Sequence, residues 1–172
     1  MLPRSSTYIP SLDYTIMPDN FVLGTQNTTA LNYQNPMWQG IFNDTKKNQV
    51  PIIIDSGLAY SYLPSDIVLP YVRQFTAPVG RFGKQYWAPC DAKVPKFGIT
   101  IGGKTLYLDE HDLLQQGVSQ TQDYRGTPIK LCLISMTDTY PNGPFVMGGM
   151  LLNNFVTAFD VGKAEVRFYT RK

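Results

Sequence analysis

A single carboxylate ends a run of three isoleucines in the segment VPIIIDSGLAYSYLP, residues 50–64. Asp55 closes the apolar run and is followed directly by Ser56 and Gly57. A carboxylate acts as a general acid or base when burial or a neighbouring group tunes its ionisation. Alternatively, Asp55 caps a turn that Ser56 and Gly57 close, because turns favour Asp, Ser and Gly. The segment by itself leaves both interpretations open.

Other reactive residues have weaker contexts. His111, the single histidine, lies in YLDEHDLL, which we interpret as a polar loop, and a Ser-His or Cys-His nucleophile would need a partner for which no elbow motif exists. Asp109, Glu110 and Asp112 beside it lack the spacing and the glycine of a calcium-binding loop. We therefore expect these carboxylates to be solvated, and we expect no metal and no cofactor.

The two cysteines bear on the cellular compartment. Cys90 and Cys132 form either one disulfide or two separate buried thiols, and no Cys-x-x-Cys or His-Cys spacing supports a metal site. Asn27 and Asn43 both begin the acceptor pattern for N-glycosylation. The amino terminus has no apolar signal segment, so the chain is either cytosolic or has lost a leader. Together these features favour a secreted or vacuolar protein of the secretory pathway.

Length and composition predict one globular domain over residues 1–172, because 172 residues with 43% hydrophobic content bury a substantial single core. The 15 basic and 13 acidic residues are scattered, without the basic stripe that binding to nucleic acid requires. No apolar stretch approaches the roughly 20 residues that cross a bilayer. We expect neither a nucleic-acid nor a membrane partner.

Short alternating apolar runs, broken by 14 glycines and 13 prolines, predict a mainly β fold. The clearest hairpin spans residues 97–108 with its turn at Gly102 and Gly103. A second hairpin is predicted at residues 158–169, with its turn at Gly162.

One segment departs from strand periodicity. Residues 64–75 predict a short helix, with Ser65 or Asp66 as its cap. Residues 1–49 are rich in Asn, Thr, Tyr and Pro and indicate loops and edge strands, of which residues 21–24 form the best strand. The role of residues 1–49 stays open.

Several motifs follow one another in an order that resembles the carboxy-terminal lobe of the pepsin-like aspartic proteases. The segments that carry the resemblance are IIIDSGLAYSYLP, PKFGITIGGKTLYLDEHDLL and VMGGMLLNNFVTAFDVGKAEVRFY. The match is convincing over about residues 50–170. It implies a single lobe built from ψ-loop β-sheets with one or two short helices. Cys90 and Cys132 flank the middle segment as the disulfide of that lobe does, so the resemblance implies that they are bridged.

The resemblance also assigns roles to the residues of the opening segment. Asp55 would be the catalytic carboxylate, and Ser56 would offer its hydroxyl to the backbone across the interface between two lobes. Gly57 would permit the turn and let backbone N–H groups approach the carboxylate. Met147 and Gly148 would form the strand that braces the loop.

The resemblance is incomplete at the catalytic centre. Aspartic proteolysis uses two carboxylates that share one proton, and this chain contains one Asp-Ser/Thr-Gly triplet, so a monomer is expected to lack the pair. Leu58 stands where the family usually has a Thr or Ser whose hydroxyl donates to the catalytic carboxylate. Gly149 stands where Asp is common, at a position that we take to be structural.

Three functions are compatible with these residues. The first is a lobe of an acid endopeptidase that acts on a peptide or protein and is completed by a second lobe or a second copy in a homodimer. The second is a secreted binding or inhibitory module without proteolytic activity. The third is an enzyme acting on a small molecule, with Asp55 as a lone acid or base.

Overall fold

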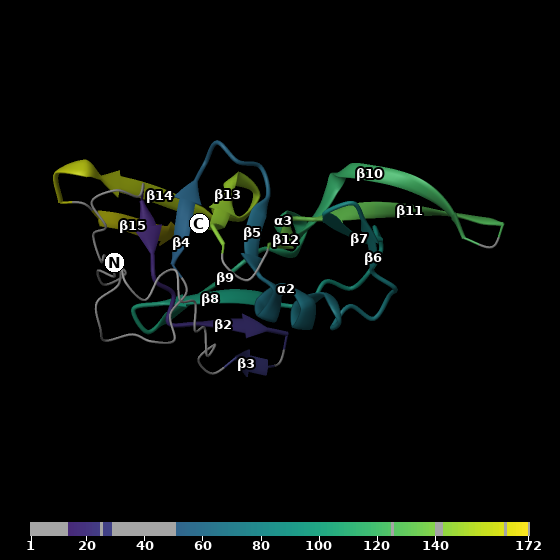
Figure 1. Cartoon of the computed structure of the whole chain (residues 1–172), viewed down its shortest axis with the longest axis horizontal. Coiled ribbons are helices and arrows are strands. Elements are labelled where there is room, and N and C mark those ends of the chain that lie inside the picture. The colour runs from purple at the N-terminus through teal and green to yellow at the C-terminus, as the bar shows by residue number, and fades with distance from the viewer. Residues whose placement is uncertain are drawn as a thin grey trace.

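The computed structural model describes residues 14–24, 26–28, 51–124, 126–139, 143–163 and 165–171. These residues are mostly in strands, and the helices among them are short. This confirms the mainly β single lobe that was expected. The strands form three larger sheets and a two-stranded hairpin (Figure 1).

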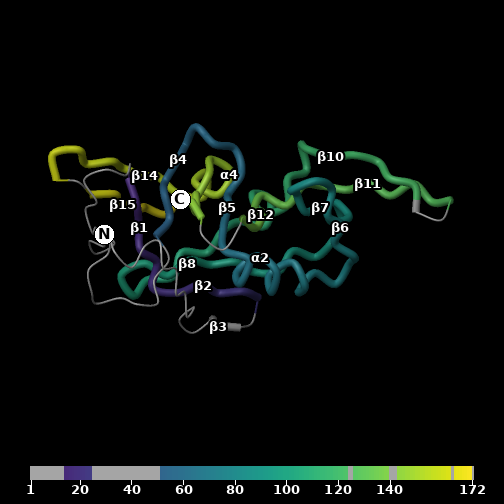
Figure 2. Tube along the Cα trace, viewed as in Figure 1, coloured from purple at the N-terminus to yellow at the C-terminus, as the bar shows by residue number. Residues whose placement is uncertain are grey.

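The five-stranded sheet has the order β1–β4–β13–β5–β12. Its strands are β1 (Thr15–Ile16), β4 (Ile52–Asp55), β5 (Ser61–Pro64), β12 (Met136–Thr139) and β13 (Phe145–Gly148). β13 comes late in the chain but lies between β4 and β5, as the traces in Figure 2 show. It pairs in parallel with β4 and antiparallel with β5. The loop between β4 and β5 therefore passes beside the end of β13.

Burial explains why β4 and β13 take the centre of this sheet. Ile52 and Ile54 of β4, and Phe145 and Met147 of β13, are 5% exposed or less. Strands that are apolar on their inward positions are stabilised by removal of that surface from water. Ile52 and Ile54 are thus needed to build the strand that positions Asp55.

A second sheet has the order β3–β2–β8–β9. Its strands are β2 (Asn20–Leu23), β3 (Gln26–Thr28), β8 (Phe97–Ile101) and β9 (Lys104–Tyr107). The hairpin predicted over residues 97–108 is confirmed, and Gly102 and Gly103 both have positive φ in its turn, at 58° and 75°. The predicted strand at residues 21–24 is confirmed as β2, one residue earlier.

The predicted hairpin near the carboxyl end is also confirmed. It consists of β14 (Phe155–Asp160) and β15 (Glu165–Thr170), joined through a short 3-10 turn at Val161–Lys163. Phe155 and Phe168 are buried on its inner face and pack edge to face.

Two further helices have a single turn each. Helix α3 (Glu110–Leu113) follows β9, and helix α4 (Gly149–Leu152) follows β13.

The remaining sheet has the order β10–β11–β7–β6. Its strands are β6 (Gly80–Phe82), β7 (Gln85–Pro89), β10 (Leu114–Tyr124) and β11 (Thr127–Ile134). The outer part of β10 and β11 extends away from the rest of the molecule (Figure 1). We call this pair the hairpin arm.

The predicted helix is present as α2 (Ser65–Val72), but the predicted cap is wrong. Pro64 occupies the N-cap position, and no side chain caps the first turn. The Ser65 hydroxyl instead donates to Asp138 Oδ2 at 3.4 Å and to the Thr139 carbonyl at 3.3 Å, while Asp66 is exposed. Ser65 therefore joins the helix to β12 rather than closing its own N-terminus.

Candidate active site

Asp55 is the last residue of β4 and its side chain is exposed. Its Oδ1 accepts a hydrogen bond from the Gly57 backbone N–H at 2.8 Å. Its carbonyl accepts a longer bond from the Leu58 N–H at 3.4 Å. The strand therefore ends in a tight turn that leaves the carboxylate facing solvent with one oxygen oriented by the backbone.

The loop after Asp55 is held by the end of β13. Gly148 lies directly beside Asp55 in the parallel register. The Gly149 N–H donates to the Leu58 carbonyl at 2.6 Å, and the Met150 N–H donates to the Ala59 carbonyl at 3.0 Å. These bonds connect the loop to α4 through main-chain atoms alone.

Gly148 lies at the point where β13 and the loop that follows Asp55 come into close contact. A Cβ at this position would lie 2.2 Å from the Tyr60 carbonyl oxygen and 2.7 Å from that of Leu58. Its N–H donates to the buried Ser61 Oγ at 3.0 Å. Only glycine fits such a contact without moving the backbone, so Gly148 sets the distance between β13 and the loop.

The structure brings together most of the residues predicted for the site. Asp55, Ser56 and Gly57 form the turn, and Met147 and Gly148 pair with Ile54 and Asp55. Ser56 is exposed, and its contact across a lobe interface stays a prediction. Leu58 is half-buried and contributes its backbone carbonyl, while its side chain has no hydroxyl to offer the carboxylate.

A hollow of about 230 Å³ lies beside the loop. Tyr60 and Tyr62 line it, facing the turn between β6 and β7. Its remaining walls are Phe82, Gly83, Lys84, Gln85, Ile134, Met136 and Thr137. The wall is mainly aromatic and aliphatic with a lysine beside it, as is common in small-molecule pockets.

A polar cluster behind this hollow was not anticipated. The Asp138 carboxylate accepts a hydrogen bond from the Tyr86 hydroxyl at 2.8 Å and forms an ion pair with Arg81 at 3.2 Å. Burial, followed by the bond to Asp138, raises the pKa of Tyr86 to about 12. Arg81 and Tyr86 lie more than 50 positions before Asp138, so no local pattern could have indicated the contact.

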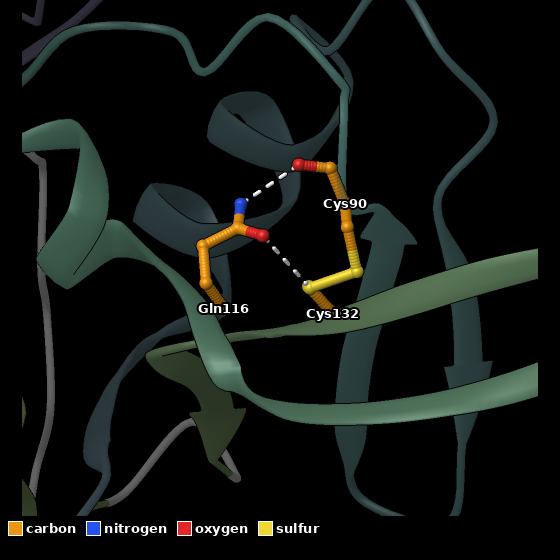
Figure 3. The surroundings of a disulfide bond; sticks show 3 residues. All are labelled: Cys90, Gln116 and Cys132. Carbon is orange, nitrogen blue, oxygen red and sulfur yellow. Dashed lines mark hydrogen bonds between the residues drawn. A yellow bond between two sulfur atoms is a disulfide. The ribbon is translucent and has the colours of Figure 1, made fainter.

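The predicted disulfide is present between Cys90 and Cys132 (Figure 3). It joins the end of β7 to β11, and Cys132 is fully buried. Gln116 lies across the bridge: its Nε2 donates to the Cys90 carbonyl at 2.7 Å, and its Oε1 lies 3.6 Å from Cys132 Sγ. The base of the hairpin arm is thus fixed covalently.

Other candidate residues belong to elements other than the one that carries Asp55. His111 is exposed, in the short helix α3 rather than the loop that was expected, and Asp109 caps that helix by accepting from the His111 N–H at 2.8 Å. Burial, with a further contribution from Asp109, raises the pKa of Asp112. Among the described residues, no group of three or more His, Cys, Asp or Glu could hold a metal ion.

The glycosylation candidates stay predictions. Asn43 lies outside the described residues, and Asn27 lies in β3 without a described side chain. Within the described part of the chain, no helix is both long enough and apolar enough to span a bilayer.

A strand β13 inserted between β4 and β5, with an Asp-Ser-Gly turn at the end of β4, defines a lobe of the aspartic protease type. The sequence profile of the family "Eukaryotic aspartyl protease" matches residues 21–170. This chain belongs to the eukaryotic aspartyl protease family.

Two relatives illustrate the match. A probable aspartic-type endopeptidase of Aspergillus fumigatus is 32% identical over 121 residues, which are 69% of this chain and 27% of that protein. An acid protease of Saccharomycopsis fibuligera is 25% identical over 120 residues, which are 70% of this chain and 28% of that protein. The chain therefore spans little more than a quarter of the length of these relatives.

Proposed function

We propose that this chain is the carboxy-terminal lobe of an acid endopeptidase, in which Asp55 supplies one of two catalytic carboxylates. The observation that carries the proposal is the exposed Asp55 carboxylate on a turn held by the main chain of β13 and α4. A reacting group must be accessible and held in a fixed position. Membership of the family supports the same role.

The chemistry needs a second carboxylate. One member of the pair accepts a proton from the attacking water, and the other protonates the carbonyl oxygen of the scissile peptide bond. Asp55 is suited to either task because its Oδ1 is oriented by the Gly57 N–H and its carboxylate is open to solvent. The second carboxylate comes from another lobe or from a second copy of this chain.

An exposed apolar surface supports such a partner. Val156 of β14 and Tyr169 of β15 lie opposite each other on the outer face of the terminal hairpin and are 55% and 37% exposed. Val161 at the turn of the same hairpin is 80% exposed. Grouped apolar side chains on a surface mark a contact with another protein surface. We propose that a second lobe covers this hairpin.

Leu58 supports the second candidate function, a secreted binding or inhibitory module. A hydroxyl donor at this position would be worth roughly 1.5 to 3 kcal/mol to a charged acceptor. Leu58 offers no such donor, which favours a module that binds a partner without cleaving it. The disulfide, together with the acceptor patterns at Asn27 and Asn43, supports the secretory pathway for either function.

Peptide cleavage at about pH 3 to 7 tests the proposal and identifies the source of the second carboxylate. The purified chain and its Asp55→Asn variant are assayed alone and in mixtures. If two copies form the pair, activity falls with the square of the fraction of unmodified chain. If a different lobe is required, neither protein cleaves alone, and only the wild-type chain cleaves once that lobe is added. Cleavage that is unchanged in Asp55→Asn contradicts the proposal, and binding of a protein partner without cleavage favours the second function.

A further inference from the structure

The two strands of the hairpin arm have different outer edges. β11 pairs with β7 over Leu131–Leu133, and just beyond this pairing the Lys130 carbonyl accepts a hydrogen bond from the Cys90 N–H at 3.0 Å. Further out, Pro128 has no N–H to offer. β10 is the last strand of its sheet and has no neighbour on its other side within the described part of the chain. One edge is therefore occupied or blocked, and the other is open.

The register identifies the main-chain groups along the open edge. Thr121 lies opposite Lys130, and the Lys130 carbonyl turns away from β10 toward Cys90. In an antiparallel ladder, the two residues of such a pair do not form hydrogen bonds with each other. Their backbone N–H and C=O groups point away from the partner strand on both strands. The same orientation recurs at every second residue. Ser119, Thr121 and Asp123 therefore direct their backbone N–H and C=O groups toward solvent.

β10 has a register shift between Gln115 and Ser119 and one charged residue, Asp123, and the edge between these two features is unprotected. Natural edge strands usually carry Lys, Pro or an inward charge that prevents pairing with another chain. Residues 115–122 read QQGVSQTQ and contain no charge and no proline. Ser119 and Thr121 are exposed. Such an edge is a template for another strand.

We propose that β10 pairs with β10 of a second copy of this chain, antiparallel, with the two-fold axis passing beside Thr121. In this register Thr121 faces Thr121 of the second copy, and Ser119 faces its Asp123. Thr–Thr pairs are favourable across strands, and no like charges oppose each other. An interface of this kind uses the same surface on both copies and closes on itself. Each copy satisfies the outward groups of the other.

An unpaired side chain supports the same register. Gln120 Nε2 is buried and has no hydrogen-bond partner within the described part of the chain. In the proposed pairing, Gln120 faces Gln122 of the second copy, whose carboxamide oxygen accepts from Nε2 once the flexible Gln120 side chain turns toward it. An unsatisfied amide is costly to bury, and this contact gives Gln120 Nε2 an acceptor.

This contact is separate from the proposed catalytic site. β10 belongs to the four-stranded sheet, whereas Asp55 ends a strand of the five-stranded sheet. The arm extends away from that sheet in Figure 1. Pairing through β10 is therefore expected whether or not the chain is proteolytic, and Asp55→Asn leaves it unchanged.

The test is the oligomeric state of the full chain by sedimentation over a wide range of concentration. Thr121→Lys places two ammonium groups beside the axis and raises the dimer dissociation constant about tenfold or more. Thr127→Lys is the matched control, since it makes the same change at an exposed position of β11 and leaves dimerisation unchanged. Mixing Thr121→Lys with Thr121→Glu restores association. Circular dichroism verifies that each variant is folded.

Amide hydrogen exchange gives an independent readout of the register. The N–H groups of Ser119, Thr121 and Asp123 exchange quickly in the dilute protein and slowly in the concentrated one. Those of Gln120 and Gln122, which face β11, are protected at both concentrations. A chain that stays monomeric at every concentration, or that dimerises equally with Thr121→Lys, overturns the proposal. So does protection that does not depend on concentration.

Discussion

The five-stranded sheet and the sheet with the hairpin arm hold their strands by different means. In the first, β13 lies between two earlier strands, and Gly148 leaves no space for a side chain against the loop that follows Asp55. In the second, a disulfide joins β11 to the residue that follows β7, and within the described part of the chain the outer edge of β10 has no neighbour. Close main-chain contact fixes the position of the loop that carries the Asp55 carboxylate. A covalent bond stabilises the place where the strands of the hairpin arm leave the core.

Removal of the disulfide tests how the hairpin arm is held and has the largest expected effect on the free energy of unfolding. Changing Cys90 and Cys132 together to Ala lowers the free energy of unfolding by about 4 kcal/mol, because the bridge closes a loop with a sequence separation of 42. Urea denaturation measures the loss, and the reduced wild-type protein is the control. Two reactive thiols in the unfolded, unreduced protein would contradict the bridge.

Gly148→Ala tests the close contact between β13 and the loop that follows Asp55. The new Cβ meets the Tyr60 and Leu58 carbonyl oxygens at 2.2 and 2.7 Å, so the strand or the loop must move, at a cost of about 3 kcal/mol in the free energy of unfolding. Gly149→Ala is the matched control, because its Cβ lies 3.5 Å from the nearest carbonyl oxygens. Equal stability of the two variants by urea denaturation would show that Gly148 does not set the loop position.

Tyr86→Phe tests the join between the two regions, since Tyr86 lies on β7 and Asp138 on β12. Loss of a bond to a charged acceptor lowers the free energy of unfolding by about 1.5 kcal/mol at neutral pH. The pKa of Tyr86 is raised from 10.0 to about 12 in the folded protein. The stabilisation is therefore complete below about pH 10 and is lost as the pH rises through about 12.

The control for this change is Tyr107→Phe, at a side chain that is 57% exposed. Surface changes of this kind alter stability by less than about 0.5 kcal/mol. Denaturation at neutral and at alkaline pH measures both variants. A difference between wild type and Tyr86→Phe that does not shrink in alkali would count against the bond to Asp138.

The smallest effect concerns the start of the arm. Burial and the nearby Asp109 raise the pKa of Asp112, so its ionised form is disfavoured in the folded state. Asp112→Asn is therefore slightly more stable than wild type at neutral pH, by less than about 0.5 kcal/mol because solvent screens the site. The gain disappears as the pH falls below the carboxyl range. Asp66→Asn, at an exposed carboxylate, shows no such dependence; a gain that persists in acid would contradict this prediction.

Local patterns predicted the elements that depend on neighbouring residues. Two hairpins illustrate this: the one around Gly102 and Gly103 and the carboxy-terminal one. In each, the turn residues and the alternating apolar residues lie within about a dozen positions of the sequence. The position of α2 was also predictable. Its cap was not, because the Ser65 hydroxyl finds a partner 73 positions away at Asp138.

The site itself was predictable only in part. The Asp-Ser-Gly turn follows from the strand and the turn residues, but the placement of β13 between β4 and β5 came from the family resemblance rather than from periodicity. Parallel pairing of strands about 90 positions apart leaves no local sequence signal. The cluster around Asp138 was missed for the same reason, because its partners Arg81 and Tyr86 lie 57 and 52 positions away.

The most direct test of Asp55 as a catalytic carboxylate is acid peptide cleavage by three proteins of equal stability: wild type, Asp55→Asn and Asp66→Asn. Each is assayed with the second lobe or at a concentration that gives the active assembly. Both aspartates are exposed, so the two variants differ in position and not in chemistry. We expect Asp66→Asn to cleave as wild type does and Asp55→Asn to lose cleavage. Equal cleavage by all three proteins would show that Asp55 is not the catalytic group.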